Sequence, residues 1–281
     1  RLGSKVSVVE LTDGLLPGAD RDLIRPLQKR LTSLFDNRIF LNTKVTSLKD
    51  VGDGVEVAFQ GDAKAGTEKY DRVLISTGRR PASGGLGLEN TQVEVTEAGF
   101  VVCDNQQRTA DPHIRAIGDV AGEPMLAHKA THEAKVAVEA LLGQPAVFDA
   151  MAIPAVVFTD PEVAWAGLTE TQAKAEGRAY EVAMYPWGAS GRAHALGRTD
   201  GLTKWLVDPE DRRVLGCGIV GPGAGELIAE AVIVIEMGGE IRDVTGSIHA
   251  HPTLSETLMN AAEVYIGTAT EIYKPKRERK S

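Results

Sequence analysis

The chain has 281 residues, of which 43% are hydrophobic and 25% charged, as expected for a soluble globular protein of about two domains. Its net charge is −8 and it has no basic stripe, so nucleic-acid binding is not expected. The one basic run, 274–281, is interpreted as a solvated tail. No apolar stretch approaches the ~20 residues that span a bilayer, and we expect neither a membrane span nor a signal peptide.

The two cysteines, Cys103 and Cys217, lie far apart and form no C-x-x-C or zinc-binding spacing. Each lies in a strand-like apolar run, so we expect buried, unreactive thiols. The lack of a disulfide framework favours a reducing compartment and therefore a cytoplasmic location.

The first half of the chain alternates between strand-like and helix-like patterns. Apolar runs predict strands over 5–10, 38–50, 54–61, 70–77 and 112–120. Apolar spacing predicts helices over 22–35 and 126–143. Pro26 is expected in the first turn of the earlier helix, where a proline is tolerated. This alternation is typical of an α/β nucleotide-binding architecture.

A change of composition near residue 150, where prolines and β-formers gather, indicates a second kind of fold. Thr169 and Gln172 match a capping box that starts a helix, which is expected to end near Gly177. Antiparallel strands are expected over 180–220, followed by helices over 225–238 and 255–266. The predicted fold class is an α/β nucleotide-binding part, with partial Rossmann-like segments, followed by an α+β domain.

Glu10 ends the first predicted strand. In dinucleotide-binding folds, an acid at the end of the second strand bonds the adenosine ribose hydroxyls, about 20 residues after a glycine-rich loop. Glu10 fits that place, although an ordinary strand-end glutamate is the commoner explanation of this residue alone. No arginine follows it directly, which favours a cofactor without a 2′-phosphate.

Two glycine-containing strand ends are further candidates. Ser76–Arg79 follows a predicted strand, where a glycine lets the backbone approach a ligand, but a plain exit into a loop fits equally well. Gly118 and Asp119 precede the helix that starts near Leu126. The carboxylate can accept hydrogen bonds from a polyol, and the free N–H groups of the helix start favour negative charge. An aspartate that only caps the loop is the alternative.

His128 and His132 have an i, i+4 spacing that is compatible with metal binding. The sequence shows no H-E-x-x-H pattern and no third ligand, so no metal site is predicted there.

The stretch 247–256, SIHAHPTLSE, combines two histidines, a proline and a glutamate. Pro252 disfavours a helical conformation for His251, and the helix that follows brings Glu256 back toward His251 Nδ1. The other ring nitrogen then remains free to exchange a proton, as in a triad without its nucleophile. A capped loop with a surface histidine, or a metal pair from His249 and His251, fits the spacing as well.

Seven stretches, in chain order, resemble the dihydrolipoamide dehydrogenases, a family of flavin-dependent disulfide reductases. They are VVE, TKV, TGRRP, AIGDVAGEPMLAHKATHEA, FTDPEVAWAGLTE, PWGASGRA and HAHPTLSE. The last is highly specific, and the similarity covers the whole chain. The resemblance implies the end of an NAD-binding domain over 1–80, a returning segment of an FAD-binding domain over 81–150, and an interface domain over 151–281.

The resemblance also implies site residues. His251 would be the proton acceptor and Glu256 its orienter. NAD contacts would come from Glu10, Val45, Ser76, Thr77, Gly78 and Arg79. FAD contacts would come from Gly118, Asp119, Met125, Leu126, Ala127 and His128.

In the family, dihydrolipoamide bound to the acyltransferase of 2-oxoacid dehydrogenase complexes is oxidised by an active-site disulfide, and electrons pass through FAD to NAD. The interface domain forms a homodimer, and each active site takes its histidine from the partner subunit. The resemblance therefore implies an FAD-dependent, NAD-linked oxidoreductase. Glutathione and trypanothione reductases, which share the dyad, and a non-catalytic dimerisation or docking module are the alternatives.

The sequence departs from the family pattern in its cysteines and glycines. The C-x-x-x-x-C redox pair and the glycine-rich loops for FAD and NAD are absent from these 281 residues, and Cys103 and Cys217 match neither redox position. We therefore expect the chain to correspond to the C-terminal part of such an enzyme. By itself it should be inactive and bind FAD weakly.

Overall fold

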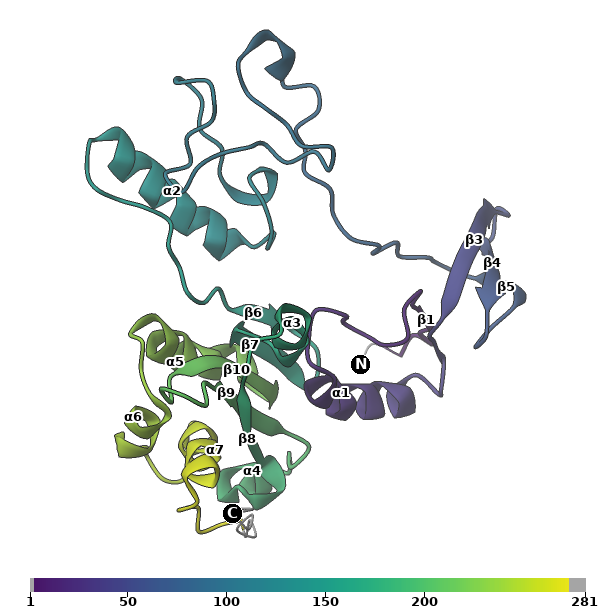
Figure 1. The fold of residues 1–281 in the computed structure, drawn as a ribbon. Coiled ribbons are helices and arrows are strands. Elements are labelled where there is room, and N and C mark those ends of the chain that lie inside the picture. Colours follow the sequence, from purple (N-terminus) through teal and green to yellow (C-terminus); the bar gives the residue numbers. More distant parts are fainter. Residues whose placement is uncertain (1–2, 273–281) are drawn as a thin grey trace. The chain divides into compact units, whose positions relative to one another are not determined.

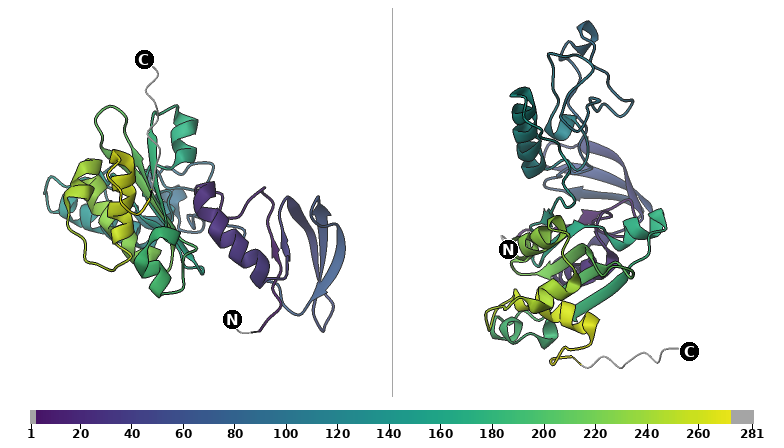
Figure 2. Two further views of the ribbon diagram at one scale, coloured as in Figure 1. Left: turned by 90° about the horizontal axis from the view of Figure 1, so that it is seen from below. Right: turned by 60° about the vertical axis from the view of Figure 1, so that its left-hand side comes forward.

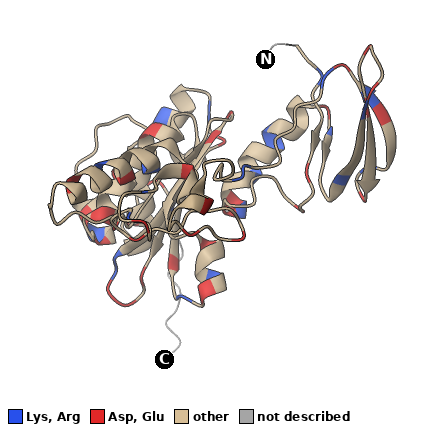
Figure 3. Ribbon diagram, turned by 90° about the horizontal axis from the view of Figure 1, so that it is seen from above, with Lys and Arg blue, Asp and Glu red and all other residues tan. Residues whose placement is uncertain are grey.

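A computed structural model describes residues 3–272 (Figure 1). The basic run interpreted as a solvated tail lies outside them. The described chain divides into two compact units: the first joins the residues up to Val73 with those from Pro154 onward, and the second is Leu74–Ile153. Within 3–272, no helix is both long and apolar enough to cross a bilayer. Acidic and basic positions are interspersed along the helices and loops (Figure 3).

The first unit is built on a five-stranded antiparallel sheet. Its order is β6-β7-β10-β9-β8, which places β10 at the centre. The strands are β6 (Ala155–Val157), β7 (Glu162–Gly167), β8 (Glu181–Pro186), β9 (Leu202–Val207) and β10 (Val214–Gly221). The antiparallel strands predicted within 180–220 are therefore confirmed.

Side chains alternate across this sheet, so that neighbouring residues of β9 contact different helices. Lys204 bonds to α1 (Arg21–Leu34), whereas Thr203 and Trp205 on the opposite face bond to α7 (Glu256–Ile266). Figure 2 shows α1 and α7 beside the sheet from two directions. The helices predicted at 22–35 and 255–266 are thus present within a residue of their expected ends.

The sheet face that carries Lys204 also carries a hydrophobic cluster with α1. Leu23, Ile24 and Leu27 are 1% exposed and pack with Val163 and Val220 of the central strands. Close approach depends on a glycine at 218, where an added Cβ would lie 2.4 Å from a Leu23 methyl carbon. The helix is therefore packed directly onto the centre of the sheet.

The remaining helices of the first unit agree in part with the sequence. α3 (Glu170–Glu176) begins with the predicted capping box and ends at Gly177, and α5 (Ala224–Glu236) packs against β6, β7 and β10. Two short helices, α4 (Gly191–Ala195) and α6 (Ile241–Gly246), were not predicted. Both have too few residues for a hydrophobic period to be recognised.

The position predicted for Pro26 is wrong. α1 begins at Arg21, so Pro26 lies in its second turn and leaves the Asp22 carbonyl without its i+4 donor. The early start is stabilised by the Arg21 guanidinium, which donates to the carbonyls of Leu15, Leu16 and Ala19. These bonds fix the loop that enters the helix.

The N-terminal part of the first unit contains two small sheets. β1 (Val8–Val9) pairs in parallel with β2 (Ile39–Phe40), so the strand predicted at 5–10 is present but short. β3 (Thr43–Asp50) and β4 (Val55–Gly61) form an antiparallel sheet with β5 (Gly66–Tyr70), which was not predicted.

The second unit consists largely of loops around α2 (Ala127–Leu141), the helix predicted at 126–143. Two short 3-10 turns, Leu88–Asn90 and Gly118–Val120, interrupt the loops.

The strands predicted at 70–77 and 112–120 are wrong. Leu74 is 92% exposed and Ile75 66%, and residues 71–81 pair with no strand among the described residues. The segment 112–120 makes one isolated bridge, between Arg115 and Arg108. A buried strand requires neighbours that satisfy its backbone N–H and C=O groups along its length. Within 3–272, residues 71–81 have no such strand beside them, and 112–120 makes only scattered backbone bonds, among them those to Val101, Gln107 and Thr109.

Candidate functional site

The expected histidine–glutamate hydrogen bond is present at the start of α7. His251 Nδ1 lies 2.9 Å from Glu256 Oε1, and Glu256 Oε2 accepts the backbone N–H of Thr253 at 2.7 Å. Because a carboxylate only accepts, Nδ1 carries the proton, and Nε2 of the neutral ring keeps its lone pair. The side chain of His251 is 79% exposed and that of Glu256 16%. The ring is therefore accessible while its acidic partner is held in the fold.

A chain of buried groups fixes the first turn of α7 to the sheet. Trp187 Nε1 donates to Thr203 Oγ1 at 2.9 Å, Thr203 Oγ1 lies 2.8 Å from Thr257 Oγ1, and Thr257 Oγ1 donates to the Leu254 carbonyl at 2.7 Å. The side chains of Trp187, Thr203 and Thr257 are fully buried. Since Thr257 adjoins Glu256, this chain positions the carboxylate. No local sequence pattern predicts it, because its members are remote in sequence.

The two histidines of the stretch 247–256 are separated by their partners. His249 is 7% exposed, its Nε2 lies 2.8 Å from Glu230 Oε1, and its Nδ1 lies 2.9 Å from the Ser247 carbonyl oxygen. His251 instead faces Glu256. Both nitrogens of His249 are engaged, so the metal pair that the spacing left open is not formed.

Glu10 and Val45 lie close together in the N-terminal sheets. Glu10 directly follows β1, and its carbonyl accepts the Thr43 N–H at the start of β3, the strand that carries Val45. Glu10 Oε1 accepts both the N–H and the hydroxyl of Thr12, at 2.8 and 2.9 Å. These bonds fix the carboxylate and leave Oε2 for a ligand hydroxyl, which fits the expected contact with a ribose.

In the second unit, Arg79 brings candidate residues from separate segments together. Its guanidinium bonds Asp119 Oδ2 at 3.0 Å and also donates to the Met125 carbonyl. Ser76, Thr77 and Gly78 precede it in the same irregular segment.

The start of α2 fits an anionic or electron-rich group. Leu126 is its N-cap residue without a side-chain cap, and no acidic residue occupies the first turn, which begins with Ala127 and His128. Backbone N–H groups at such a terminus attract negative charge. This fits the expected FAD contacts.

Two models of one protein family match the chain. The pyridine nucleotide-disulphide oxidoreductase model matches residues 1–134, and the dimerisation domain of the same proteins matches 153–262. The chain belongs to the pyridine nucleotide-disulphide oxidoreductase family. The predicted resemblance and fold class are therefore confirmed.

Curated members of this family are similar over nearly the whole chain. This chain is 48% identical to the dihydrolipoyl dehydrogenase of Vibrio cholerae over 99% of its length, and 42% identical to that of Bacillus subtilis over 97%. In both comparisons it covers 58% of the relative, so it spans somewhat more than half of their length.

Two solved structures, one of them a flavoprotein disulfide reductase, have the same fold. LpdA from Mycobacterium tuberculosis is similar with a TM-score of 0.85 and 27% identity, over 93% of this chain and 56% of that one. The HOCl-induced flavoprotein disulfide reductase RclA from Escherichia coli has a TM-score of 0.79 and 30% identity, over 91% of this chain and 58% of that one.

Neither cysteine of this pyridine nucleotide-disulphide oxidoreductase chain is part of a reactive pair. Both thiols are free. Burial raises the pKa of Cys217 well above its ordinary value, and nearby Glu230 adds to the effect. Cys103 is half-buried, and burial followed by the charge of Glu133 raises its pKa as well. A raised pKa lowers the thiolate fraction and with it the reactivity of both thiols. Cys217 is buried as predicted, whereas Cys103 is only half-buried.

A buried ion pair on α2 was missed by the sequence analysis. Lys129 Nζ lies 2.7 Å from Glu133 Oε1, and the two side chains are 5% and 4% exposed. Glu133 Oε2 also accepts the Gly118 N–H at 2.6 Å, and Lys129 donates to the Gly122 carbonyl at 3.1 Å. The pair thus ties both ends of the loop that carries Asp119 to the helix. Its i, i+4 spacing was visible, but its burial was not.

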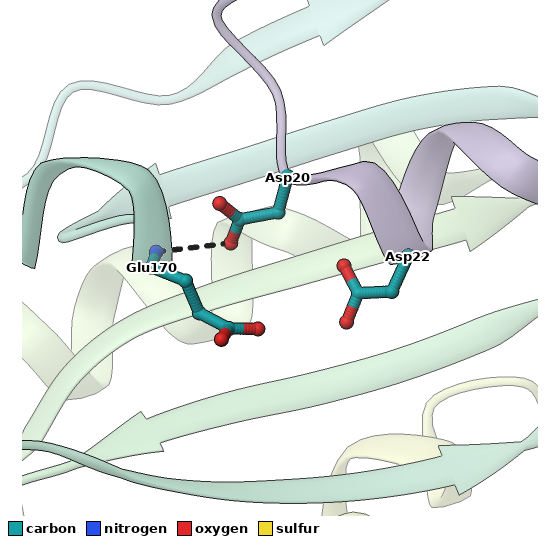
Figure 4. Close-up of side chains that lie close together, drawn as sticks. All are labelled: Asp20, Asp22 and Glu170. Carbon is teal, nitrogen blue, oxygen red and sulfur yellow. Dashed lines mark hydrogen bonds between the residues drawn. The ribbon is translucent and has the colours of Figure 1, made fainter. Parts of the chain in front are cut away.

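A second buried charge cluster joins α1, α3 and β9. Asp20, Asp22 and Glu170 face one another (Figure 4), in the one grouping of carboxylates within 3–272 whose geometry would suit a metal ion. Lys204 Nζ lies 2.8 Å from an oxygen of each of them, and its side chain is 1% exposed. The ammonium group therefore occupies the place of a metal ion and offsets part of the negative charge, and the cluster stabilises the fold.

The carboxylates of this cluster respond to the ammonium group. Burial alone would raise the pKa of Asp20, but hydrogen bonds from Lys204 and the N–H groups of Glu170 and Thr171 outweigh burial and lower it. The pKa of Glu170 is lowered against burial in the same way, mainly by Lys204. Conversely, these acids raise the pKa of Lys204 although burial opposes the charge.

Proposed function

We propose that this chain forms part of a dihydrolipoyl dehydrogenase, which oxidises protein-bound dihydrolipoamide to lipoamide and reduces NAD⁺ to NADH. The observation that carries the proposal is the hydrogen bond between His251 and Glu256 at the start of α7. It occurs in a chain that is 48% identical to an enzyme of that name.

In this proposal His251 exchanges a proton with a thiol. Oxidation of a dithiol to a disulfide releases two electrons and two protons, and Nε2 of His251 accepts one proton as a thiol becomes the nucleophilic thiolate. Glu256 holds the ring in the Nδ1–H tautomer and stabilises the imidazolium that forms. A base positioned in this way supplies about 10²–10⁴-fold in rate.

The redox disulfide of the reaction has to come from residues outside these 281. Cys103 and Cys217 are 114 positions apart, both thiols are free, and burial raises the pKa of each. The 281-residue chain alone is therefore inactive toward dihydrolipoamide in this proposal.

The cofactor residues are proposed on their geometry. Glu10 and Val45 would hold NAD, together with Ser76, Thr77, Gly78 and Arg79. Asp119 would accept hydrogen bonds from FAD, supported by Gly118 and the helix start at Met125, Leu126, Ala127 and His128. When bound, these cofactors supply the two-electron transfer chemistry that the side chains of this chain lack.

We propose a homodimer in the cytoplasm, with the lipoylated acyltransferase of a 2-oxoacid dehydrogenase complex as the substrate carrier. The dimerisation-domain match at 153–262 supports the homodimer. Exposed apolar side chains within the matched range support it too: Ile233 on α5 is 65% exposed, Met237 just after α5 is 80% exposed, and Ile248 is fully exposed. A second copy that covered them would bury this surface.

The test of the proposed function is His251→Gln in an active form of the protein, read separately in the two half-reactions. Dihydrolipoamide oxidation should fall about 10²-fold or more, because the proton acceptor is lost. Reduction of the flavin by NADH should remain largely intact, because hydride transfer needs no such base. His194→Gln is the matched control, since His194 is exposed and, among residues 3–272, its side chain bonds the Gly188 carbonyl and no carboxylate. Equal loss in both half-reactions would contradict the assignment.

Two further measurements separate the alternatives. A preference for NADPH over NADH would favour a glutathione-reductase-like enzyme, against the proposal from Glu10. A stoichiometric flavin band together with dihydrolipoamide turnover by these 281 residues alone would show that the redox disulfide is not needed from elsewhere.

A further inference from the structure

The segment that carries His251 has no backbone–backbone hydrogen bonds to fix its position within the described chain. Residues 248–253 lie between α6 and α7, and none of them makes a backbone–backbone hydrogen bond within the described chain. Burial does not hold it either, because Ile248 is fully exposed and the His251 side chain is 79% exposed. The position of His251 therefore depends on side-chain contacts at the two ends of the segment.

The C-terminal end of the segment is fixed through Thr253. Its N–H donates to Glu256 Oε2 at 2.7 Å, and its hydroxyl donates to the Ala250 carbonyl at 2.7 Å. These contacts orient the turn around His251, including Ala250 immediately before it, but they do not connect the segment to α5 or α6.

The N-terminal end is fixed by His249, whose side chain is 7% exposed and lies on a segment that is otherwise exposed. Its Nδ1 lies 2.9 Å from the Ser247 carbonyl oxygen, just beyond the end of α6, and its Nε2 lies 2.8 Å from Glu230 Oε1. Glu230 lies on α5, a helix held against the sheet by buried Ile228, Ala231 and Ile235. The imidazole thus ties the segment to the end of α6 and to a packed helix.

We propose that His249 and Glu230 form a second histidine–carboxylate pair that positions His251. The pair holds the chain two residues before the base, as Thr253 holds it two residues after. His249 is therefore a positioning residue. This inference rests on the proposed function, in which His251 is the proton acceptor. Loss of the tie lets the segment 248–252 move, so that the His251 ring no longer keeps its alignment with Glu256. Misplacement of about 1 Å can reduce a rate by about 10².

The tie is tested by nitrogen-15 spectroscopy of the His251 ring in the full chain, with His249→Ala and Glu230→Ala. In the unaltered protein, His251 should be the Nδ1–H tautomer. Each variant should give a mixture of tautomers, and the double variant should look like either single one, because all three remove the same link. Glu230→Gln should retain the native signature, because an amide still bonds Nε2 while Nδ1–H donates to Ser247.

Control variants are Glu226→Ala, at an exposed position one turn earlier on α5, and His194→Ala. Neither should change the His251 signal. A native tautomer in His249→Ala, or an equal change in the controls, would overturn the proposal.

The same variants separate this inference from the proposed function. In an active form of the protein, His249→Ala should slow dihydrolipoamide oxidation about tenfold, less than His251→Gln, and leave the NADH half-reaction unchanged. If His251→Gln has no effect on the thiol step, the proposed function fails. The ring spectrum still decides whether His249 holds the segment.

Discussion

Replacing Lys204 by methionine should destabilise the first unit strongly. Methionine keeps most of the side-chain volume but removes the ammonium group, which lies 2.8 Å from oxygens of Asp20, Asp22 and Glu170. Removing one partner of a buried ion pair leaves uncompensated charge and costs about 3–5 kcal/mol. At about 2–4 °C per kcal/mol for a protein of this size, the midpoint of thermal unfolding should fall by roughly 10 °C.

The measurement is denaturant and thermal unfolding followed by circular dichroism, with Lys174→Met as the matched control. Lys174 also bonds Glu170, at 3.3 Å, but its side chain is 68% exposed. Exposed ion pairs contribute little, so the control should unfold close to the unaltered protein. If Lys204→Met shifts the midpoint no more than Lys174→Met does, the cluster does not stabilise the fold as argued.

Three further predictions concern stability. Thr169→Ala removes the capping-box acceptor of α3 and should cost about 1 kcal/mol in urea unfolding. Lys129→Met should cost about 3–5 kcal/mol in the same assay, and Lys129→Met with Glu133→Leu should recover much of it, because no charge is then left buried. The pKa values of Asp20 and Glu170 are lowered, so their stabilising effect is present above an ordinary carboxyl pKa of about 4 and is lost as the pH falls through the lowered values. The difference in urea midpoint between the unaltered protein and Lys204→Met should therefore shrink as the pH is lowered from 7 toward 2, and a difference that stays constant would refute the linkage.

Elements with their own local signal were predictable from the sequence. The helices α1, α2, α5 and α7 show an apolar period, α3 shows its capping box, and His251 and Glu256 are close enough in sequence for one turn to join them. Elements that depend on other segments were not predictable. The runs at 70–77 and 112–120 have strand-like composition, but no strand pairs with them.

The side-chain contacts that support the site follow the same division. Trp187, Thr203 and Thr257 meet only because β9 brings them together, and Lys204 meets Asp20 across more than 180 positions of sequence. Spacing patterns report neighbours along a helix or strand, whereas these contacts depend on strand order. The charges of Lys129 and Lys204 can be read from the sequence, but their burial cannot be predicted from it.

The packing of α1 on the centre of the sheet has a consequence for how the protein is made. Leu23, Ile24 and Leu27 belong to the first tenth of the chain, but their partner strand β10 is Val214–Gly221. At about 5–20 residues synthesised per second, roughly 10–40 s pass before that strand emerges. During this interval the apolar face of α1 has no sheet to cover it, so the nascent chain exposes a site for chaperones or for aggregation.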